Sequence, residues 1–176
     1  GDDHPTCAEG MRHLAAVQQM MGELSASVET LQRAAEIMRA GLGEKHPDAV
    51  QTYAALADAK AQAGDLPAAE EMLVKVADLE RERVGDDHPD YGRAVQQLGR
   101  LYLMMNNVPA AEVRYREVWQ IVRKAHGEEH PEYARAVQDL AMLYHQVGDL
   151  GSAAQFYQLA SDIRRENPGD TSGSRS

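Results

Sequence analysis

The sequence predicts an all-α solenoid of four helix-turn-helix units, with eight helices in all. The first observation is a G-x-x-H-P frame that recurs every 42 residues, beginning at Gly1, Gly43, Gly85 and Gly127. The second is that each unit holds two runs of about 17 residues with helical spacing of apolar side chains. The third is the glycine or asparagine that separates the runs. A fixed period of this length is typical of arrays whose units bury their apolar faces against one another. We therefore expect one domain over residues 1–168, with repeats at 1–42, 43–84, 85–126 and 127–168.

The fourth unit illustrates the helical pattern. In its first run the apolar residues stand at i, i+3, i+4 and i+7: Val137, Leu140, Ala141 and Tyr144. In its second run one stripe is formed by Ala153, Tyr157, Ala160 and Ile163. Residues at this spacing share one face of a helix, so both stripes are expected to be buried.

Proline, glycine and histidine mark the helix boundaries. The missing N–H of proline costs nothing in the first turn of a helix, which fits Pro5, Pro47, Pro67, Pro89, Pro109 and Pro131. Glycine and asparagine tolerate a left-handed backbone after a helix, which fits Gly22, Gly64, Asn106 and Gly148. The histidines before the frame prolines are expected to cap or pack locally at helix starts: His4, His46, His88 and His130.

Composition excludes several classes of protein. The formal net charge is −10, and phosphate binding depends on clustered lysine and arginine, so a nucleic-acid role is not expected. No run of 18 apolar residues predicts a membrane span, and the N-terminus does not read as a secretory signal. The single cysteine, Cys7, allows no internal disulfide. These features fit a cytoplasmic protein.

The residues of the fourth unit resemble the tetratricopeptide repeat (TPR). They follow its pattern through Leu140, Ala141, Tyr144, Gly148, Leu150, Ala153, Tyr157 and Ala160. The period of 42 and the G-x-x-H-P frame are similar to the longer repeat of kinesin light chains. The resemblance implies a right-handed superhelix that binds a peptide or partner protein in a concave groove. This sequence departs from the pattern at Gln18 and Lys60, where the repeat usually has tyrosine. In the longer repeat, the first helix commonly presents asparagines to the groove, and this sequence lacks them. Their places hold Gln96-Gln97 and Gln138-Asp139 in the last two units.

In the groove expected from this resemblance, arginines and apolar side chains come together in units three and four. Its candidate residues are Arg93, Gln96, Arg100, Leu103, Met104, Arg135, Gln138, Met142 and His145. Arginine pairs well with carboxylates, so the expected ligand is an acidic peptide with hydrophobic anchors. The alternative is that these arginines pair with neighbouring glutamates and only keep a helix face soluble.

The sequence offers no convincing catalytic or metal site. Residues 126–130 match H-x-x-E-H, an inverted zinc-peptidase motif that needs both histidines on one continuous helix. Here Gly127 and Pro131 place the motif in a turn, so no zinc is expected. A nucleophilic cysteine at position 7 would need a base and an orienting residue, and the repeat pattern predicts neither. We expect a non-enzymatic protein without a cofactor.

Two other functions remain open. The chain is alternatively the regulatory segment of a larger protein that carries an NTPase or caspase-like protease domain, or a module that self-associates through open repeat ends. Ser161 and Arg164 stand where the third unit has Trp119 and Val122, which suggests a polar C-terminal end for the array. The N-terminal side would then be cut from a longer array or packed on another domain, or the open face of unit one would drive self-association. Residues 169–176 are expected to be a disordered polar tail.

Overall fold

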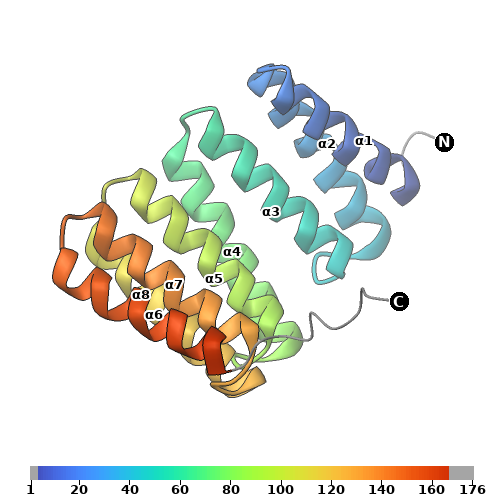
Figure 1. Ribbon diagram of the computed structural model, residues 1–176. Helices are drawn as coiled ribbons and strands as arrows, with labels where there is room; N and C mark the ends of the chain where they lie inside the picture. The colour runs from blue at the N-terminus through green and yellow to red at the C-terminus, as the bar shows by residue number, and fades with distance from the viewer. Residues whose placement is uncertain (1–3, 167–176) are drawn as a thin grey trace, which may run out of the picture. The chain divides into compact units, whose positions relative to one another are not determined.

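The computed structural model describes residues 4–166, and in that range it contains eight α-helices and no strand (Figure 1). The helices are α1 (Pro5–Met20), α2 (Leu24–Leu42), α3 (Pro47–Gln62), α4 (Leu66–Val84), α5 (Pro89–Met104), α6 (Val108–His126), α7 (Pro131–Gln146) and α8 (Leu150–Glu166). Each predicted repeat contains one pair of these helices, so the all-α fold class of four helical hairpins is confirmed. The predicted tail, 169–176, lies outside the described residues.

The histidine before each frame proline caps the helix that follows. The Nδ1 atom of His88 accepts a hydrogen bond from the backbone N–H of Asp90 over 3.1 Å, and Nδ1 of His130 accepts one from Glu132 over 3.2 Å. His4 and His46 make the same contact at α1 and α3. An N-terminal N–H has no partner within its own helix, so this acceptor satisfies it. The predicted capping role is confirmed.

The turn inside each hairpin requires a left-handed backbone. Asn106 has φ 56°, and the glycines at the three matching positions have φ between 79° and 89°. Asparagine is among the few residues other than glycine that adopt this conformation readily. The turn therefore keeps its geometry in the third repeat although the glycine is absent.

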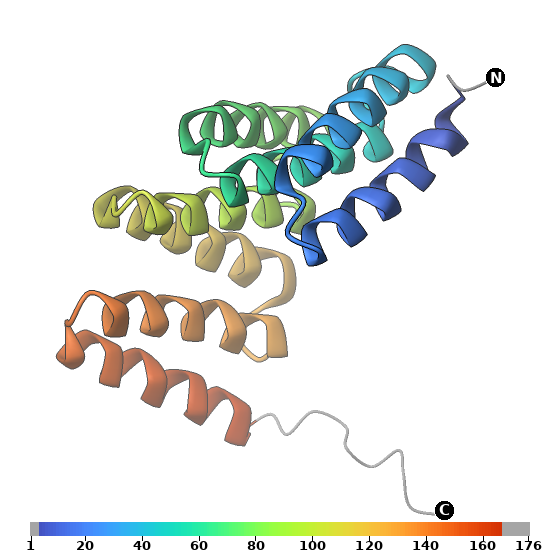
Figure 2. The same cartoon turned by 90° about the horizontal axis from the view of Figure 1, so that it is seen from above.

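The helices group into two compact units, Gly1–Gly85 and Asp86–Ser176. In the first unit α1 packs on α2, α2 on α3, and α3 on α4. In the second unit the same order joins α5 to α6, α6 to α7, and α7 to α8 (Figure 2). Each unit thus holds two of the predicted repeats, and the single domain over 1–168 stays a prediction.

The core of each unit lies between consecutive helices. In the second unit, Leu140 and Leu143 of α7 pack with Ala111 and Tyr115 of α6. The first predicted stripe of the fourth repeat is buried at Val137, Leu140 and Ala141, with Tyr144 half-buried.

The prediction for the second stripe of the fourth repeat is wrong at Tyr157. The other three stripe residues are buried, but the side chain of Tyr157 is 37% exposed. The equivalent tyrosine 42 residues earlier, Tyr115, is buried because it packs with Leu140 and Leu143 of the following helix, α7. No described helix follows α8 to cover Tyr157 in the same way.

Candidate functional site

A hydrogen bond between side chains of α5 and α7 lies at the centre of the candidate site. The amide Nε2 of Gln96 donates to Oδ2 of Asp139 over 2.6 Å. Burial raises the pKa of the Asp139 carboxyl above its ordinary value, and the hydrogen bond from Gln96 acts against this shift. Burial disfavours a charged carboxylate unless a donor compensates, so Gln96 stabilises Asp139 in this position.

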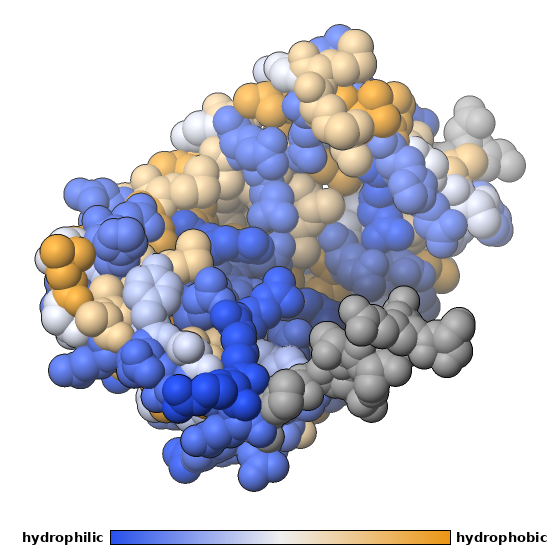
Figure 3. Space-filling view, in the orientation of Figure 1, coloured by the Kyte–Doolittle hydropathy of each residue, from blue (hydrophilic) through white to orange (hydrophobic). Residues whose placement is uncertain are grey.

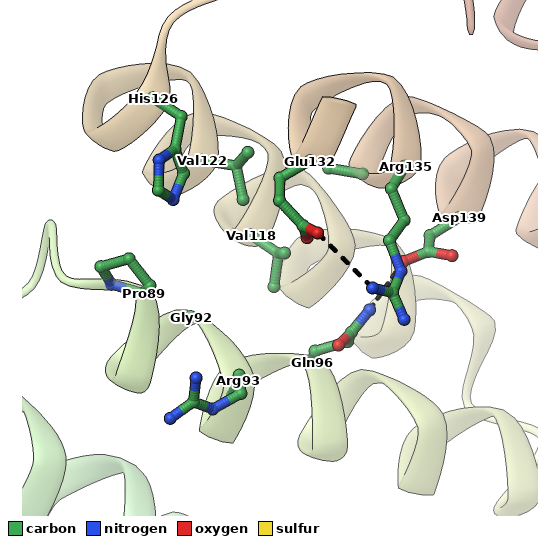
Figure 4. A pocket seen from close by; sticks show the side chains of 11 residues that line it. Pro89, Gly92, Arg93, Gln96, Val118, Val122, His126, Glu132, Arg135 and Asp139 are labelled. Atoms are coloured by element: carbon green, nitrogen blue, oxygen red, sulfur yellow. Dashed lines mark hydrogen bonds and ion pairs between the residues drawn. The ribbon is translucent and has the colours of Figure 1, made fainter. Parts of the chain in front are cut away.

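Gln96 and Asp139 line one side of a pocket of about 380 Å³ (Figure 4). One wall is apolar and comes from Val118 and Val122 of α6, with His126 at the end of the same helix. The remaining lining comes from α5 and α7: Pro89, Gly92, Arg93, Gln96, Glu132, Arg135, Ala136 and Asp139. An apolar wall combined with a few polar groups is typical of a ligand-binding cleft.

Glycine at position 92 permits a close contact between two helices beside this pocket. A Cβ atom at Gly92 would lie 3.3 Å from Cγ2 of Ile121, which is tighter than an ordinary contact. Ile121 is itself buried. The absence of a side chain at this position therefore allows α5 to approach α6 closely beside the pocket.

The three candidate arginines differ in their ion pairs. Arg93 pairs with Asp90, and Nη1 of Arg135 lies 3.6 Å from Oε1 of Glu132. Arg100 makes no ion pair with any residue in the described range, although its charge acts on nearby Asp139. Two of the three arginines thus pair with an acid one helical turn away, whereas Arg100 has no such ion pair among residues 4–166.

The structure places three of the nine predicted groove residues in the pocket, namely Arg93, Gln96 and Arg135. Among the other six, Gln138 is turned toward α8, where its side chain accepts a hydrogen bond from Arg164. Leu103 is half-buried against the core between α6 and α7. Arg100, Met104, Met142 and His145 are exposed on α5 and α7.

Sequence reasoning did not include Asp139, Glu132 and His126 in the candidate site. Asp139 had a visible signal, because it is the one acid among the residues that replace the groove asparagines in the last two repeats. Glu132 and His126 had none, since exposed residues near a helix end usually only face solvent. Their place in the pocket follows from the packing of α5, α6 and α7.

The histidines at residues 126–130 do not form a metal site in the described structure. Gly127 ends α6 with φ 82°, and α7 begins at Pro131, so the two histidines stand on either side of a turn. Their rings are stacked with centroids 4.5 Å apart. No group of three or more His, Cys, Asp and Glu residues within 4–166 is arranged to hold a metal ion. None of the helices in that range is long and apolar enough to span a membrane.

Comparisons with known proteins agree with this repeat geometry. The family model for the tetratricopeptide repeat matches residues 6–81 and 110–166. The chain therefore belongs to the TPR family. No curated protein matches the sequence.

Solved structures show the same fold at low sequence identity. A putative kinesin light chain from Podosopora anserina, with nearly identical TPR-like repeats, is 24% identical with a TM-score of 0.78, covering 98% of this chain and 79% of its own. BtubC (BKLC) from P. vanneervenii is 20% identical with a TM-score of 0.78, covering 96% and 67%. A Rap protein complexed with competence and sporulation factor is 16% identical with a TM-score of 0.74, covering 94% and 45%.

Proposed function

We propose that this chain is a non-catalytic protein-interaction scaffold that binds an extended peptide on α5 and α7 of the second unit. The observation that carries the proposal is that Arg100, which forms no ion pair within residues 4–166, lies one helical turn before the exposed residue Met104 on α5. TPR arrays commonly present such a face to a partner, and the Rap protein structure contains a bound factor. These comparisons support partner binding as the general function.

Arg100 would supply the contact with an acidic residue of the peptide. Arg100, Leu103 and Met104 are spaced i, i+3 and i+4, which places them on one side of α5. A charge-assisted hydrogen bond from guanidinium to carboxylate is stronger than a neutral one. Leu103 and Met104, with Met142 on α7, would then contact an apolar residue of the same peptide.

The pocket would bind the polar backbone next to these contacts. Gln96 and Asp139 offer amide and carboxyl oxygens, and Arg135 offers N–H donors, so the pocket contains partners for both peptide N–H and C=O groups. Arg93 and Arg135 already pair with Asp90 and Glu132. A guanidinium has five N–H donors, so each keeps further donors for a ligand. Because their charge is partly compensated, we expect them to contribute less to acid selectivity than Arg100.

The test begins with an array of peptides that carry one or two acidic residues next to apolar ones. Peptides that bind are then titrated by fluorescence polarisation. Changing Arg100 to Ala should weaken binding by roughly 5- to 150-fold, which corresponds to a charge-assisted contact of about 1–3 kcal/mol. Arg93→Ala and Arg135→Ala should have smaller effects. Binding should also weaken as salt rises, because exposed charges are screened over about 10 Å at 0.1 M.

Arg165 offers a matched control. It is an exposed arginine of α8 that pairs with Asp162 at i−3 over 2.9 Å, as Arg135 pairs with Glu132. Arg165→Ala should leave the affinity unchanged. Equal affinity of the wild type and the Arg100→Ala variant for every captured peptide would show that this face is not the binding site.

A further inference from the structure

The pocket in the second unit lies at a place that is closed in the first unit. Four of its lining residues are small: Gly92 of α5, Val118 and Val122 of α6, and Ala136 of α7. The residues at the same repeat positions in the first unit are all fully buried: Ala8, Ala34, Met38 and Thr52. The second unit therefore leaves open to solvent a place that side chains fill in the first.

Side-chain size accounts for this difference. Three residues of the first unit are larger than their counterparts in the second, at the pairs Ala8 and Gly92, Met38 and Val122, and Thr52 and Ala136. Only Ala34 is smaller than its counterpart, Val118. Because protein interiors are closely packed, shorter side chains leave space that a ligand can fill. Each of α5, α6 and α7 has a described helix before and after it in the chain, so this space lies between repeats and not at an end of the array.

The lining favours an uncharged side chain. It contains two arginines and two acids, so their formal charges cancel: Arg93, Arg135, Glu132 and Asp139. Val118 and Val122 are spaced by four residues on α6, which places them side by side as an apolar wall (Figure 4). An apolar side chain gains free energy when it leaves water for this wall. A charged side chain would lose hydration there without a net opposite charge to compensate.

The pocket has room for a whole side chain. Its volume is about 380 Å³, and an apolar cavity of about 150 Å³ is enough to bind benzene. The remaining volume leaves space for a peptide backbone beside the polar lining. Figure 3 shows that the side of the second unit with α5 and α7 is mainly hydrophilic, with apolar surface in small separate areas. The two valines of α6 therefore offer apolar contact that is scarce on the surface around the pocket.

We propose that this pocket binds an aliphatic side chain of the partner peptide, of the size of leucine or methionine, against Val118 and Val122. Methionine is the side chain that fills the same place in the first unit, at Met38, and leucine has as many side-chain heavy atoms. This inference rests on the proposed function. It adds a second apolar residue to the peptide, besides the one in contact with Met104 and Met142.

The first test uses small probes without an acidic group, so it does not depend on Arg100. N-acetyl-leucinamide and N-acetyl-methioninamide are titrated into the 176-residue chain while the methyl NMR signals of its valines are followed. Concentrations up to about 50 mM suffice, because ligands of this size bind in the millimolar range. The signals of Val118 and Val122 should shift and saturate, and N-acetyl-glycinamide should shift them far less. Val113, an exposed valine of α6 outside the pocket, should not respond.

The variant Val122→Met/Ala136→Thr gives the pocket two side chains of the first unit. It should abolish the response of Val118 to the leucine and methionine probes, because the added atoms fill the space. Val113→Met is the matched control, since it makes the same substitution on the exposed side of α6 and should leave the response unchanged. Val122→Met and Ala136→Thr are also tested singly, and circular dichroism should show equal helicity in all variants. An unresponsive Val118 in the wild type, or an equal response in the double variant, would overturn the inference.

The second test uses the acidic peptides captured on the array, with each leucine or methionine changed to alanine in turn. At one position this change should weaken binding to the wild type by roughly 10- to 150-fold, the value expected for burying such a side chain. The same change should have little effect on binding to Val122→Met/Ala136→Thr, in which Arg100→Ala should still weaken binding. Peptides that need Arg100 but bind the wild type and the double variant equally would overturn this inference and leave the proposed function standing. A pocket that binds the leucine probe while no acidic peptide is captured would contradict the proposed function instead.

Discussion

The hydroxyl of Tyr144 donates a hydrogen bond to Oε1 of Glu112 over 2.5 Å and thereby joins α7 to α6. Arg116 donates a hydrogen bond to each of these residues, to the carboxylate of Glu112 over 2.8 Å and to the hydroxyl of Tyr144 over 2.7 Å. The bond from Tyr144, followed by that from Arg116, lowers the pKa of Glu112. The tyrosine of the fourth repeat therefore stabilises the contact between two helices through a carboxylate as well as through its ring.

Tyr144→Phe tests this network while it keeps the ring that stacks on Phe156. We expect a loss of about 1 kcal/mol in the free energy of unfolding at pH 7, measured by urea denaturation. A carboxyl with a lowered folded-state pKa contributes stability above its unfolded pKa and loses it as the pH falls through the folded one. The difference between wild type and variant should therefore shrink as the pH drops below the ordinary value of 4.5. A difference that is constant with pH would contradict a role for Glu112.

Leu140→Ala tests the assigned helix register. Leu140 is fully buried and packs in the cluster between α6 and α7, so truncation leaves a cavity. We expect a loss of about 2–5 kcal/mol in the free energy of unfolding. Leu159→Ala on α8 is the control, because Leu159 is 39% exposed and should cost less than about 1 kcal/mol. Equal losses in the free energy of unfolding for the two variants would mean that the buried face of α7 is wrongly assigned.

Gly99→Ala tests the close approach of α5 and α6. A Cβ atom at Gly99 would lie 3.2 Å from Cε2 of Tyr115, a buried ring that has little room to move. Alanine normally favours a helix by about 0.5–1 kcal/mol over glycine, but overpacking costs about 1–3 kcal/mol. We expect a net loss of stability. Gly151→Ala should show none, since its nearest such contact is an ordinary 3.7 Å to Oδ1 of Asp149. Thermal melts of both variants provide the comparison.

The His126→Ala/His130→Ala variant tests whether the turn between α6 and α7 binds zinc. We expect elemental analysis of the purified wild type to find no stoichiometric zinc, because the two histidines lack a third ligand among the described residues. The double variant should lose about 1 kcal/mol of stability at most, since His130 caps α7. One equivalent of zinc that disappears in the variant would establish a metal site.

The local structure of this chain is largely determined by its sequence. The 42-residue period, the frame prolines and Asn106 with its three matching glycines fix where helices begin and end, because these residues act on their own backbone. The capping histidines also act locally, since each accepts a hydrogen bond from a backbone N–H two residues away. Such interactions need no distant partner, and they repeat whenever the local sequence repeats.

The tertiary structure decides what happens between helices. Tyr115 and Tyr157 occupy the same repeat position, yet only Tyr115 is buried, because α7 packs over it. Leu14 and Leu56 differ for the corresponding reason at the first helix. The pocket residues follow the same rule: Asp139 meets Gln96 only when α7 lies beside α5. Burial and side-chain pairing depend on which helix lies next to a residue, and identical repeat positions therefore differ between the ends of the array and its interior.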